Sequence, residues 1–498
     1  MNVNPITRLD YPDPDVIRVE DTYYMVSTTM HFMPGCEILQ SFDLVHWEHV
    51  TYVYETLDHT DAQQLKSGQN IYGQGMWAAS LRYHEGRFCI CFVANDTRKT
   101  YLYTSEKIDG PWKKQLIEGF YHDGSLLFDE DGRNYIVYGN DEIWITELNE
   151  DLTAPKKDGL HRLLVSDHKN PELGYEGSHI QKINGYYYIF LIHSLRDRWM
   201  RTEACFYSDS LEGEFTGGDV LCDDRGYCGQ GVAQGGIVDT PDGKWYAMLF
   251  QDSGAVGRIP ILVPVTWKDH FPFFGQNGHV PEEIEVHSTR PGYIYQPLVG
   301  SDDFCNGLLP HWQFNHDPDP RYYHLDALQG TYTITTREVC TELTQAVNTL
   351  TQRMSYPSCA AEVTVDASAL KEGDVAGLCA LQSCYAAVGI TKHHGKYEVL
   401  MLDKKEDGIL DMTEGTVVES HQMDFRLEAD FCNMKDEARC YYRVNKGDWL
   451  PIGTVHKLYF KLDHFTGCRF GLFCYAAEET GGSACFRDFK YYDVDEIS

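Results

Sequence analysis

A pattern of residues that occurs five times in the first three-fifths of the chain limits the folds open to it. Each copy has a small residue or a carboxylate at its head, followed by an apolar strand, a charged turn and an aromatic strand. The copies begin near Tyr11, Met76, His122, Tyr175 and Ala233. Aligning them gives five equivalent head residues, which are Asp13, Trp77, Asp123, Glu176 and Gln234.

The spacing between the head residues indicates what each copy forms. Successive heads are 64, 46, 53 and 58 residues apart, so each copy has room for several short strands. Four strands make one blade of a β-propeller, and a blade buries its faces only by stacking against neighbouring blades. We therefore predict a five-bladed β-propeller over residues 1–296. A β-sandwich with many hairpins is the alternative, but five heads in one register favour the propeller.

The propeller geometry predicts where the heads lie. The first strand of each blade is expected at or next to the central channel, with its N-terminal head near one mouth. These predicted first strands are residues 16–19, 80–83, 125–128, 179–183 and 236–239. The five heads should therefore meet at one mouth, although 221 residues separate the first from the last.

The rest of the chain, residues 301–498, alternates apolar and polar residues but has no such heads. Its predicted strands include residues 458–465, with the sequence LYFKLDHF. Ten or more strands of this kind predict two packed antiparallel sheets, a jelly-roll β-sandwich. The predicted fold class is therefore all-β, a propeller followed by a sandwich.

The composition bears on partners and location. The chain has 75 acidic and 42 basic residues, and its net charge of −33 repels nucleic acid and anionic membranes but not a neutral oligosaccharide. No stretch approaches the roughly 20 apolar residues of a membrane helix, and no secretory pattern opens the chain, so we expect a cytoplasmic protein. The 16 scattered cysteines are expected to be free thiols. A homo-oligomer is one of the assembly states that the sequence allows.

Three of the five heads are carboxylates, and this set carries the predicted chemistry. Carboxylates that converge on a channel mouth repel one another, so they need a metal, a cation or a reaction that uses different pKa values. Glycoside hydrolysis needs one protonated acid for the leaving oxygen and one ionised carboxylate to activate water. With inversion the two groups stand roughly 6.5–9.5 Å apart, a separation that a propeller channel can supply.

The neighbours of each carboxylate suggest its role. Glu176 has the longer side chain and lies at the apolar start of a strand, where burial would favour its protonated form, so we predict the general acid there. Asp13 lies between two prolines, on a stiff backbone that suits a general base, and Asp15 is its rival. Asp123 would tune the acid. Each of these residues taken alone is also compatible with an ordinary turn.

Several motifs together resemble the family 43 glycoside hydrolases, in particular the β-xylosidase and α-L-arabinofuranosidase groups with a C-terminal concanavalin-like sandwich. The resemblance extends over nearly the whole chain. It implies an inverting mechanism with Asp13 as base, Asp123 as pKa modulator and Glu176 as acid. The motifs are residues 4–35 with PDPD, 75–88 with MWAAS, 122–139 with HDGS, 175–188 with YEGSH, 257–267 with GRIP, and 301–318 with SDDF.

The resemblance also implies further contacts. Trp77 and Phe32 match aromatic walls for the sugar, and Arg258 matches an arginine that holds sugar hydroxyls. His31 and His122 are further candidates to line the site. Gln234 stands where many members have a histidine that orders water or calcium. No cofactor is then required for the chemistry, while a structural or activating calcium stays open.

Two of the family's usual motifs are altered, DPS to DGS at 123–125 and EGPH to EGSH at 176–179.

The predicted function is an exo-acting hydrolase that releases terminal xylose from β-1,4-xylo-oligosaccharides. The alternative is an α-L-arabinofuranosidase or a bifunctional enzyme. More remote alternatives are a non-catalytic carbohydrate-binding propeller and a fructan-cleaving enzyme, whose NDPNG and RDP motifs the chain lacks. A loop of the sandwich that closed the pocket would give specificity for chain ends.

Overall fold

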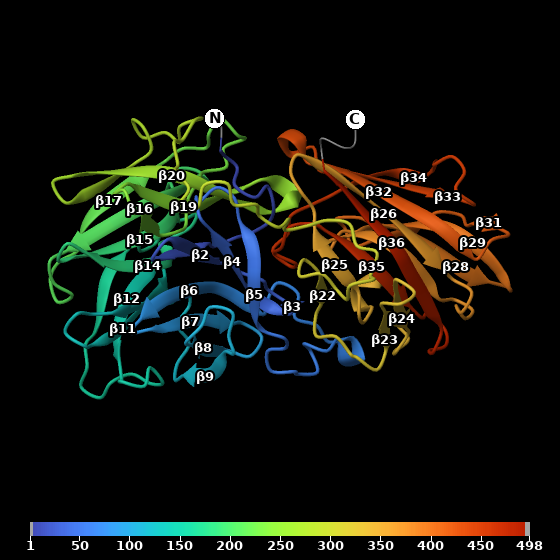
Figure 1. Cartoon of the computed structure of the whole chain (residues 1–498), viewed down its shortest axis with the longest axis horizontal. Helices are drawn as coiled ribbons and strands as arrows, with labels where there is room; N and C mark the ends of the chain where they lie inside the picture. The colour runs from blue at the N-terminus through green and yellow to red at the C-terminus, as the bar shows by residue number, and fades with distance from the viewer. Residues whose placement is uncertain (1–2, 494–498) are drawn as a thin grey trace.

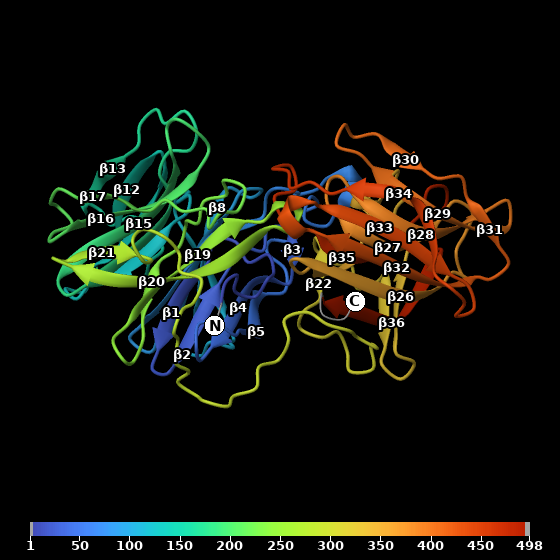
Figure 2. The same cartoon turned by 90° about the horizontal axis from the view of Figure 1, so that it is seen from above.

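The computed structural model describes residues 3–493 and has two β domains side by side (Figures 1 and 2). The first domain holds five sheets of four antiparallel strands each, and the strands of every sheet follow the order of the chain. The predicted five-bladed propeller is therefore confirmed. Blades 1 and 2 consist of β1 (Asp15–Val19), β2 (Thr22–Val26), β4 (Gly35–Ser41), β5 (Glu48–Tyr54), β6 (Met76–His84), β7 (Arg87–Ala94), β8 (Lys99–Ser105) and β9 (Lys113–Ile117).

The other three blades repeat this arrangement. They consist of β10 (Ser125–Phe128), β11 (Asn134–Asn140), β12 (Glu142–Leu148), β13 (His161–Ser166), β14 (Glu176–Ile183), β15 (Tyr186–Ser194), β16 (Arg201–Ser208), β17 (Thr216–Leu221), β18 (Ile237–Asp239), β19 (Trp245–Asp252), β20 (Arg258–Lys268) and β21 (Phe271–Phe274). The first strands β1, β6, β10 and β14 contact one another, and β1 contacts β18, so these five strands surround the channel as predicted. An apolar core fills the space between each pair of neighbouring blades.

The ring closes without an exchange of strands, because each blade takes all four of its strands from one continuous segment. The N-terminal segment instead lies against β20 of blade 5. The Asn4 amide donates to the carbonyl of Leu262 at 2.8 Å and accepts from the Leu262 N–H at 2.8 Å. A core shared by blades 1 and 5 includes Tyr23 and Tyr246, and its burial stabilises the closed ring.

The second domain is a sandwich of a nine-stranded and a seven-stranded antiparallel sheet. The seven-stranded sheet has the order β23 (Tyr323–Asp326), β24 (Thr331–Thr335), β36 (Ser483–Asp493), β26 (Ser358–Asp366), β32 (Gln422–Asp430), β33 (Glu437–Arg443) and β34 (Leu450–Lys457). The nine-stranded sheet has β3 (Phe32–Met33), β22 (Gln313–Asn315), β25 (Leu350–Arg353), β35 (Arg469–Tyr475), β27 (Val375–Leu381), β28 (Ala386–His393), β29 (Lys396–Lys404) and β30 (Leu410–Met412), with β31 (Thr416–Val418) also on β29. Short 3₁₀ turns lie at Lys66–Gly68, Gly254–Val256, Leu343–Gln345 and Cys432–Met434.

One strand of the sandwich comes from the propeller segment of the chain. The two residues of β3 pair with β22, so that Phe314 faces Met33 and Asn315 faces Phe32. The sequence pattern did not predict this pairing, because β3 is too short to show an alternation. The segment between β2 and β4 of blade 1 thus contributes an edge strand to the nine-stranded sheet.

A buried ion pair also joins the domains. The Arg353 guanidinium of β25 lies 2.8 Å from the Glu37 carboxylate of β4, and both side chains are only 2% exposed. Arg353 also donates to the carbonyl of Asp10 at 2.9 Å, and His49 contacts the second oxygen of Glu37 at 3.0 Å. Burial alone would raise the pKa of Glu37, but Arg353 and His49 hold it at about 2.

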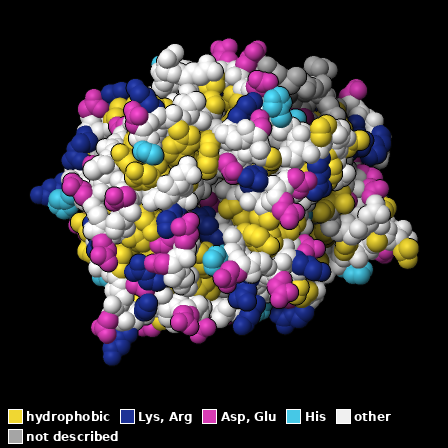
Figure 3. Space-filling view, turned by 60° about the vertical axis from the view of Figure 1, so that its left-hand side comes forward, with side chains coloured by type: hydrophobic (Ala, Val, Ile, Leu, Met, Phe, Trp, Pro, Cys, Tyr) yellow, Lys and Arg dark blue, Asp and Glu magenta, His cyan; other side chains and the backbone are white. Residues whose placement is uncertain are grey.

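The face of the molecule in Figure 3 carries acidic and basic side chains interspersed with one another. All 16 cysteines, which lie within the described residues, are free thiols as predicted. No helix in residues 3–493 has the length and apolar character of a membrane span.

We expect Arg353→Met to destabilise the protein strongly, because it leaves the buried Glu37 charge with His49 but without its arginine. Losing one partner of a buried pair costs about 3–5 kcal/mol. Since the pKa of Glu37 is lowered in the folded state, the pair contributes above the ordinary carboxyl pKa near 4.5, and the contribution is lost as the pH falls towards 2. Urea unfolding of both proteins between pH 7 and pH 3 measures the difference, which should shrink on acidification.

A matched control is Arg198→Met, which removes an exposed arginine paired with Asp197. Exposed pairs contribute little, so this variant should unfold like the wild type at every pH. An Arg353→Met variant that matches the wild type would contradict a stabilising role for the interdomain pair.

Candidate active site

All five predicted head residues line one cavity of about 520 Å³ at a mouth of the propeller channel. Asp13, Asp123 and Gln234 precede the first strands of their blades, Glu176 opens β14, and Trp77 is the second residue of β6. The predicted meeting of the five heads at one mouth is therefore confirmed. Three of them, Asp13, Asp123 and Gln234, have left-handed φ values of 52°, 48° and 64°. Such backbone strain in non-glycine residues concentrates at functional sites.

Asp13 is 7% exposed, and both its carboxylate oxygens have partners. The Thr28 hydroxyl donates to Oδ2 at 2.6 Å, and Arg258 Nη1 donates to Oδ1 at 3.1 Å. Nε and Nη2 of the buried Arg258 side chain have no hydrogen-bond partner in the described part of the chain. These two contacts hold the Asp13 carboxylate in one orientation.

Glu176, the first residue of β14 in blade 4, has a different set of neighbours. Its side chain is 22% exposed, and Oε2 accepts a hydrogen bond from the Asn140 amide at 2.7 Å. His122 Nε2 lies 3.5 Å from Glu176 Oε2 and 3.5 Å from Asp123 Oδ2. The imidazole therefore stands between two carboxyl groups.

The charge of Asp123, followed by contacts with Glu176, raises the pKa of His122 to about 9 although burial opposes the shift. Burial raises the pKa of Asp123, and the nearby His122 charge opposes that shift. His122 is therefore an imidazolium near neutral pH. His122 was predicted only as a lining residue, and the structure gives it a central electrostatic position.

Asp123 is joined to Glu176 through the backbone. The Gly177 N–H donates to Asp123 Oδ2 at 2.9 Å. Gly177 has a φ of 65°, and a Cβ there would lie 2.7 Å from the Gln234 side chain. The glycine after the predicted acid is therefore required by both its backbone conformation and its packing.

Three metal-ligating side chains lie close together among the described residues. The donor atoms of His122, Asp123 and Glu176 lie within 4.8 Å of one another. The proton on His122 supplies positive charge to these carboxyl groups. At the channel centre the Gln234 side chain offers only a neutral amide. The backbone N–H of Gln234 donates to the buried Glu203 carboxyl at 2.7 Å. That position offers a cation such as calcium few charged oxygen ligands.

Asp15, the predicted rival of Asp13, does not line this cavity. Its carboxylate is 1% exposed, accepts from Arg82 at 2.8 Å and from the Leu81 N–H at 2.7 Å, and contacts His179 at 3.0 Å. Burial alone would raise the pKa of Asp15, but Arg82 and His179 hold it below its usual range. Asp15 therefore joins blades 1, 2 and 4 inside the channel.

Two predicted ligand contacts are wrong. Phe32 is 1% exposed in the interdomain core, with the Arg469 guanidinium 3.5 Å from its ring centre, and it does not line the cavity. His31 is fully buried beside His316 and His464. The physical reason is that β3 pairs with the sandwich, which directs this segment into the domain interface.

The sandwich supplies the aromatic ring that Phe32 was expected to provide. Residues 458–465, predicted as a strand, form a loop between β34 and β35, and Leu462 and Phe465 of this loop line the cavity. Phe465 lies 5.7 Å from the Trp77 ring, and Arg258 lies 4.5 Å from the Phe465 ring centre. The strand prediction is wrong here, because an alternation of apolar and polar residues in the sequence does not by itself supply a neighbouring strand to pair with.

Asp10 fixes this loop to the propeller. Its Oδ1 accepts from the backbone N–H of Arg258 at 2.8 Å, and its Oδ2 accepts from the backbone N–H of Gly467 at 2.7 Å. A Cβ on Gly257 or Gly467 would collide with Asp10, at 2.3 Å and 2.7 Å from its side-chain atoms. One carboxylate thus sets both the arginine beside Asp13 and the loop that carries Phe465.

Further lining residues were missed by the sequence reasoning. They include Thr28, Asn140, Trp199, Arg201, Leu462 and Phe465. A signal existed for the first two, because polar residues at the end of the second strand of a blade lie beside the head of the first strand. The loop residues of the sandwich gave no signal.

The comparisons with known proteins agree with this geometry. The family model described as glycosyl hydrolases family 43 matches residues 3–272, and the model of the beta xylosidase C-terminal concanavalin A-like domain matches residues 301–492. A beta-xylosidase of Formosa agariphila is 26% identical over 99% of this chain and 89% of its own length. A non-reducing end alpha-L-arabinofuranosidase of Bacteroides ovatus is 24% identical over 82% of this chain and 79% of its own length.

A solved structure, the bifunctional GH43-CE protein of Bacteroides eggerthii, superposes with a TM-score of 0.92. It is 42% identical and covers 98% of this chain, whereas this chain spans 63% of that protein. These matches support the concanavalin-like class of the sandwich domain.

We expect the His122 ring to titrate near pH 9 in the wild type and at clearly lower pH in Asp123→Asn, which removes the largest cause of the raised pKa. NMR of protein with ¹³C-labelled histidine follows the titration, and the signal missing from His122→Gln identifies the ring. The exposed pair of His46 and Asp43 is a control, because Asp43→Asn should leave the His122 signal unchanged. A His122 pKa unaffected by Asp123→Asn would contradict this electrostatic description.

Proposed function

The chain belongs to the glycosyl hydrolases of family 43, and we propose that it releases terminal xylose from β-1,4-xylo-oligosaccharides with inversion of configuration. It is a glycoside hydrolase whose relatives include a beta-xylosidase and an alpha-L-arabinofuranosidase. The observation that supports the proposal best is the different treatment of two carboxyl groups in one cavity. Thr28 and Arg258 hold both oxygens of Asp13, while the contacts of Glu176 with Asn140 and His122 fall on Oε2 and leave Oε1 open to a leaving group.

Asp13 is the proposed general base. Arg258 and Thr28 each hold one of its oxygens, so the carboxylate is oriented. An oriented, ionised carboxylate can take a proton from a water molecule as that water attacks the anomeric carbon. The free N–H groups of Arg258 can bind sugar hydroxyls beside this water.

Glu176 is the proposed general acid. The Asn140 amide occupies Oε2, which leaves Oε1 to carry a proton to the leaving glycosidic oxygen. We propose that Asp123 tunes and positions this acid through His122 and the Gly177 N–H. The reaction proposed here needs no cofactor, since His122 supplies the positive charge beside the acid and only protons move between Asp13, water and Glu176.

The shape of the cavity supports the proposal of exo action. Trp77 and Phe465 offer apolar ring faces to a sugar, and Phe465 comes from the second domain. A cavity of about 520 Å³ that has walls from both domains suits a chain end better than a long polymer. The partner is therefore a neutral oligosaccharide, and an arabinofuranoside side chain is the alternative substrate because the Bacteroides ovatus relative is named for it.

Substrates with different leaving groups distinguish the roles of the two carboxyl groups. We expect Asp13→Asn to lower kcat/KM by about 10²- to 10⁴-fold on both nitrophenyl β-xyloside and xylobiose. We expect Glu176→Gln to show that loss on xylobiose but a much smaller one on the nitrophenyl glycoside, because nitrophenolate leaves with little protonation. Glu172→Gln, an exposed neighbour, is the control and should match the wild type.

The same assay tests the substrate. Nitrophenyl α-L-arabinofuranoside and α-L-arabinopyranoside complete the panel, and faster turnover of either would replace xylose in the proposal. Proton NMR should detect α-xylose as the first-formed anomer from a β-xyloside. No turnover on the whole panel, or the β-anomer first, would contradict the proposed activity or mechanism.

We expect Phe465→Ala to lower kcat/KM on xylobiose by about tenfold, because it removes a ring face and opens the cavity to water. Lys461→Ala, in the same loop but outside the cavity lining, is the matched control. Steady-state kinetics measures both. Equal kinetics of the two variants would show that the sandwich loop takes no part in binding the substrate.

A further inference from the structure

A second cavity of about 420 Å³ lies at the other mouth of the propeller channel. Its walls come from the C-terminal parts of the first strands of all five blades, β1, β6, β10, β14 and β18, together with Trp245 of β19. The heads of these same strands line the candidate active site. The Asp15, Arg82 and His179 contacts lie between the two ends, so the cavities are separate.

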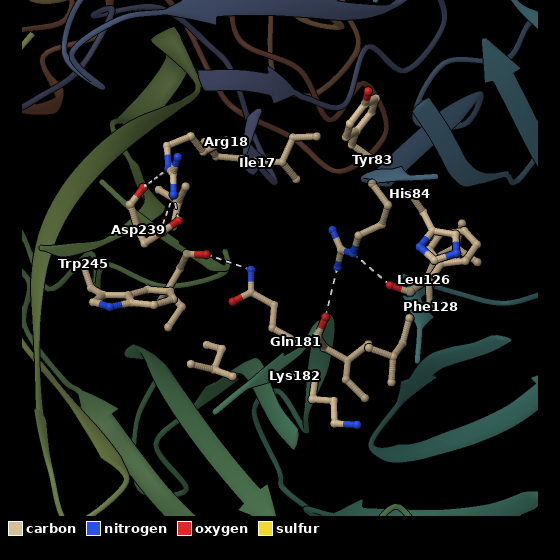
Figure 4. Close-up of a pocket in the computed structure, with 17 residues that line it drawn as sticks. Ile17, Arg18, Tyr83, His84, Leu126, Phe128, Gln181, Lys182, Asp239 and Trp245 are labelled. Carbon is tan, nitrogen blue, oxygen red and sulfur yellow. Dashed lines mark hydrogen bonds and ion pairs between the residues drawn. The ribbon is translucent and has the colours of Figure 1, made fainter. Parts of the chain in front are cut away.

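Flat side chains stand on opposite sides of this cavity (Figure 4). The partly exposed Trp245 ring lies on one side, and Tyr83, which is 45% exposed, lies on the other. Beside Tyr83, the rings of His84 and Phe128 stack with centroids 4.5 Å apart and an angle of 7°. Exposed ring faces at a cavity mouth offer contacts to the apolar face of a ligand.

The charged groups at this cavity are paired. Arg18 donates to Asp239 through two nitrogens at 2.5 Å and 3.2 Å, and Lys182 contacts Asp129 at 2.6 Å. Arg82, at the floor, is paired with Asp15. The cavity therefore has no unpaired cation to attract an anion, yet each pair keeps polar atoms at its edge.

An amide lies in the middle of this arrangement. The Gln181 Nε2 donates to the carbonyl of Ile237 at 2.7 Å, while its Oε1 has no partner among residues 3–493. Figure 4 shows this amide in the middle of the view, between Trp245 on one side and Phe128 on the other. An acceptor left over in a mostly apolar cavity costs free energy unless water or a ligand donates to it.

We propose that this cavity binds a sugar unit of a neutral pentose oligosaccharide, at a second site distinct from the candidate active site. Rings on two sides, a free amide oxygen and neutral ion pairs match a ligand with apolar ring faces and many hydroxyls. An anion lacks a free cation here, and a purely apolar ligand would leave Gln181 and the ion pairs without partners. The ligand class rests on the proposed function.

Such a site changes how the protein meets a polymer. Binding one part of a glycan at the far mouth keeps other chain ends near the exo-acting cavity and raises their local concentration. Turnover of a small nitrophenyl glycoside gains nothing from it. The second site therefore acts on large substrates only.

The test uses full-length Glu176→Gln protein and β-1,4-xylohexaose as the probe. Isothermal titration should show two binding events, one at each mouth. Adding Tyr83→Ala or Trp245→Ala should weaken one event by about tenfold or more and leave the other unchanged. Phe273→Ala, a 49% exposed aromatic of β21, is the matched control and should keep both events.

Variants with Glu176 intact separate the two proposals. Tyr83→Ala and Trp245→Ala should turn over nitrophenyl β-xyloside like the wild type, which also shows that they fold, while their retention on insoluble xylan should fall. If turnover is intact and the titration shows one event, or both events survive Tyr83→Ala and Trp245→Ala, the second site is overturned. If the wild type hydrolyses no glycoside, the proposed activity fails, while the titration still decides whether xylohexaose binds here.

Discussion

The buried Asp15 carboxylate is the contact on which the arrangement of the propeller depends. Arg82 and His179, from blades 2 and 4, both contact it, and Arg82 also donates to the carbonyl of Leu126 in blade 3 at 2.8 Å. Four blades are thereby joined at the channel by groups that cannot be left unpaired in a buried site. The contact gives the channel a floor, so that its two mouths become separate cavities with different linings.

The active-site cavity is completed by the second domain. Asp10 accepts hydrogen bonds from Arg258 of the propeller and Gly467 of the sandwich, and the loop that it fixes brings Phe465 opposite Trp77. The Glu37 and Arg353 ion pair and the pairing of β3 with β22 hold the same interface elsewhere. A displacement of the sandwich would therefore alter both the Phe465 ring opposite Trp77 and the arginine beside Asp13.

The electrostatics of the site differ from the prediction in one respect. From the sequence, burial and a neighbouring carboxylate were expected to tune the acid. In the structure an imidazolium stands between Asp123 and Glu176, and its raised pKa follows from their charges. One positive charge thus lets the carboxyl groups approach one another, which the repeat pattern alone could not reveal.

The sequence by itself determined the five blades and the five heads, because a repeated order of head, strand, turn and strand can bury its apolar faces only by stacking. It also indicated Asp13, Asp123, Glu176, Trp77, Gln234 and Arg258, all of which line the cavity. The family resemblance already favoured Asp13 over Asp15, and the tertiary structure places Asp13, but not Asp15, in the cavity lining. Only the tertiary structure placed Phe32 and His31 in the interface. It also assigned the loop at 458–465 to the active site, because contacts between domains depend on side chains distant in the chain, and no local pattern records them.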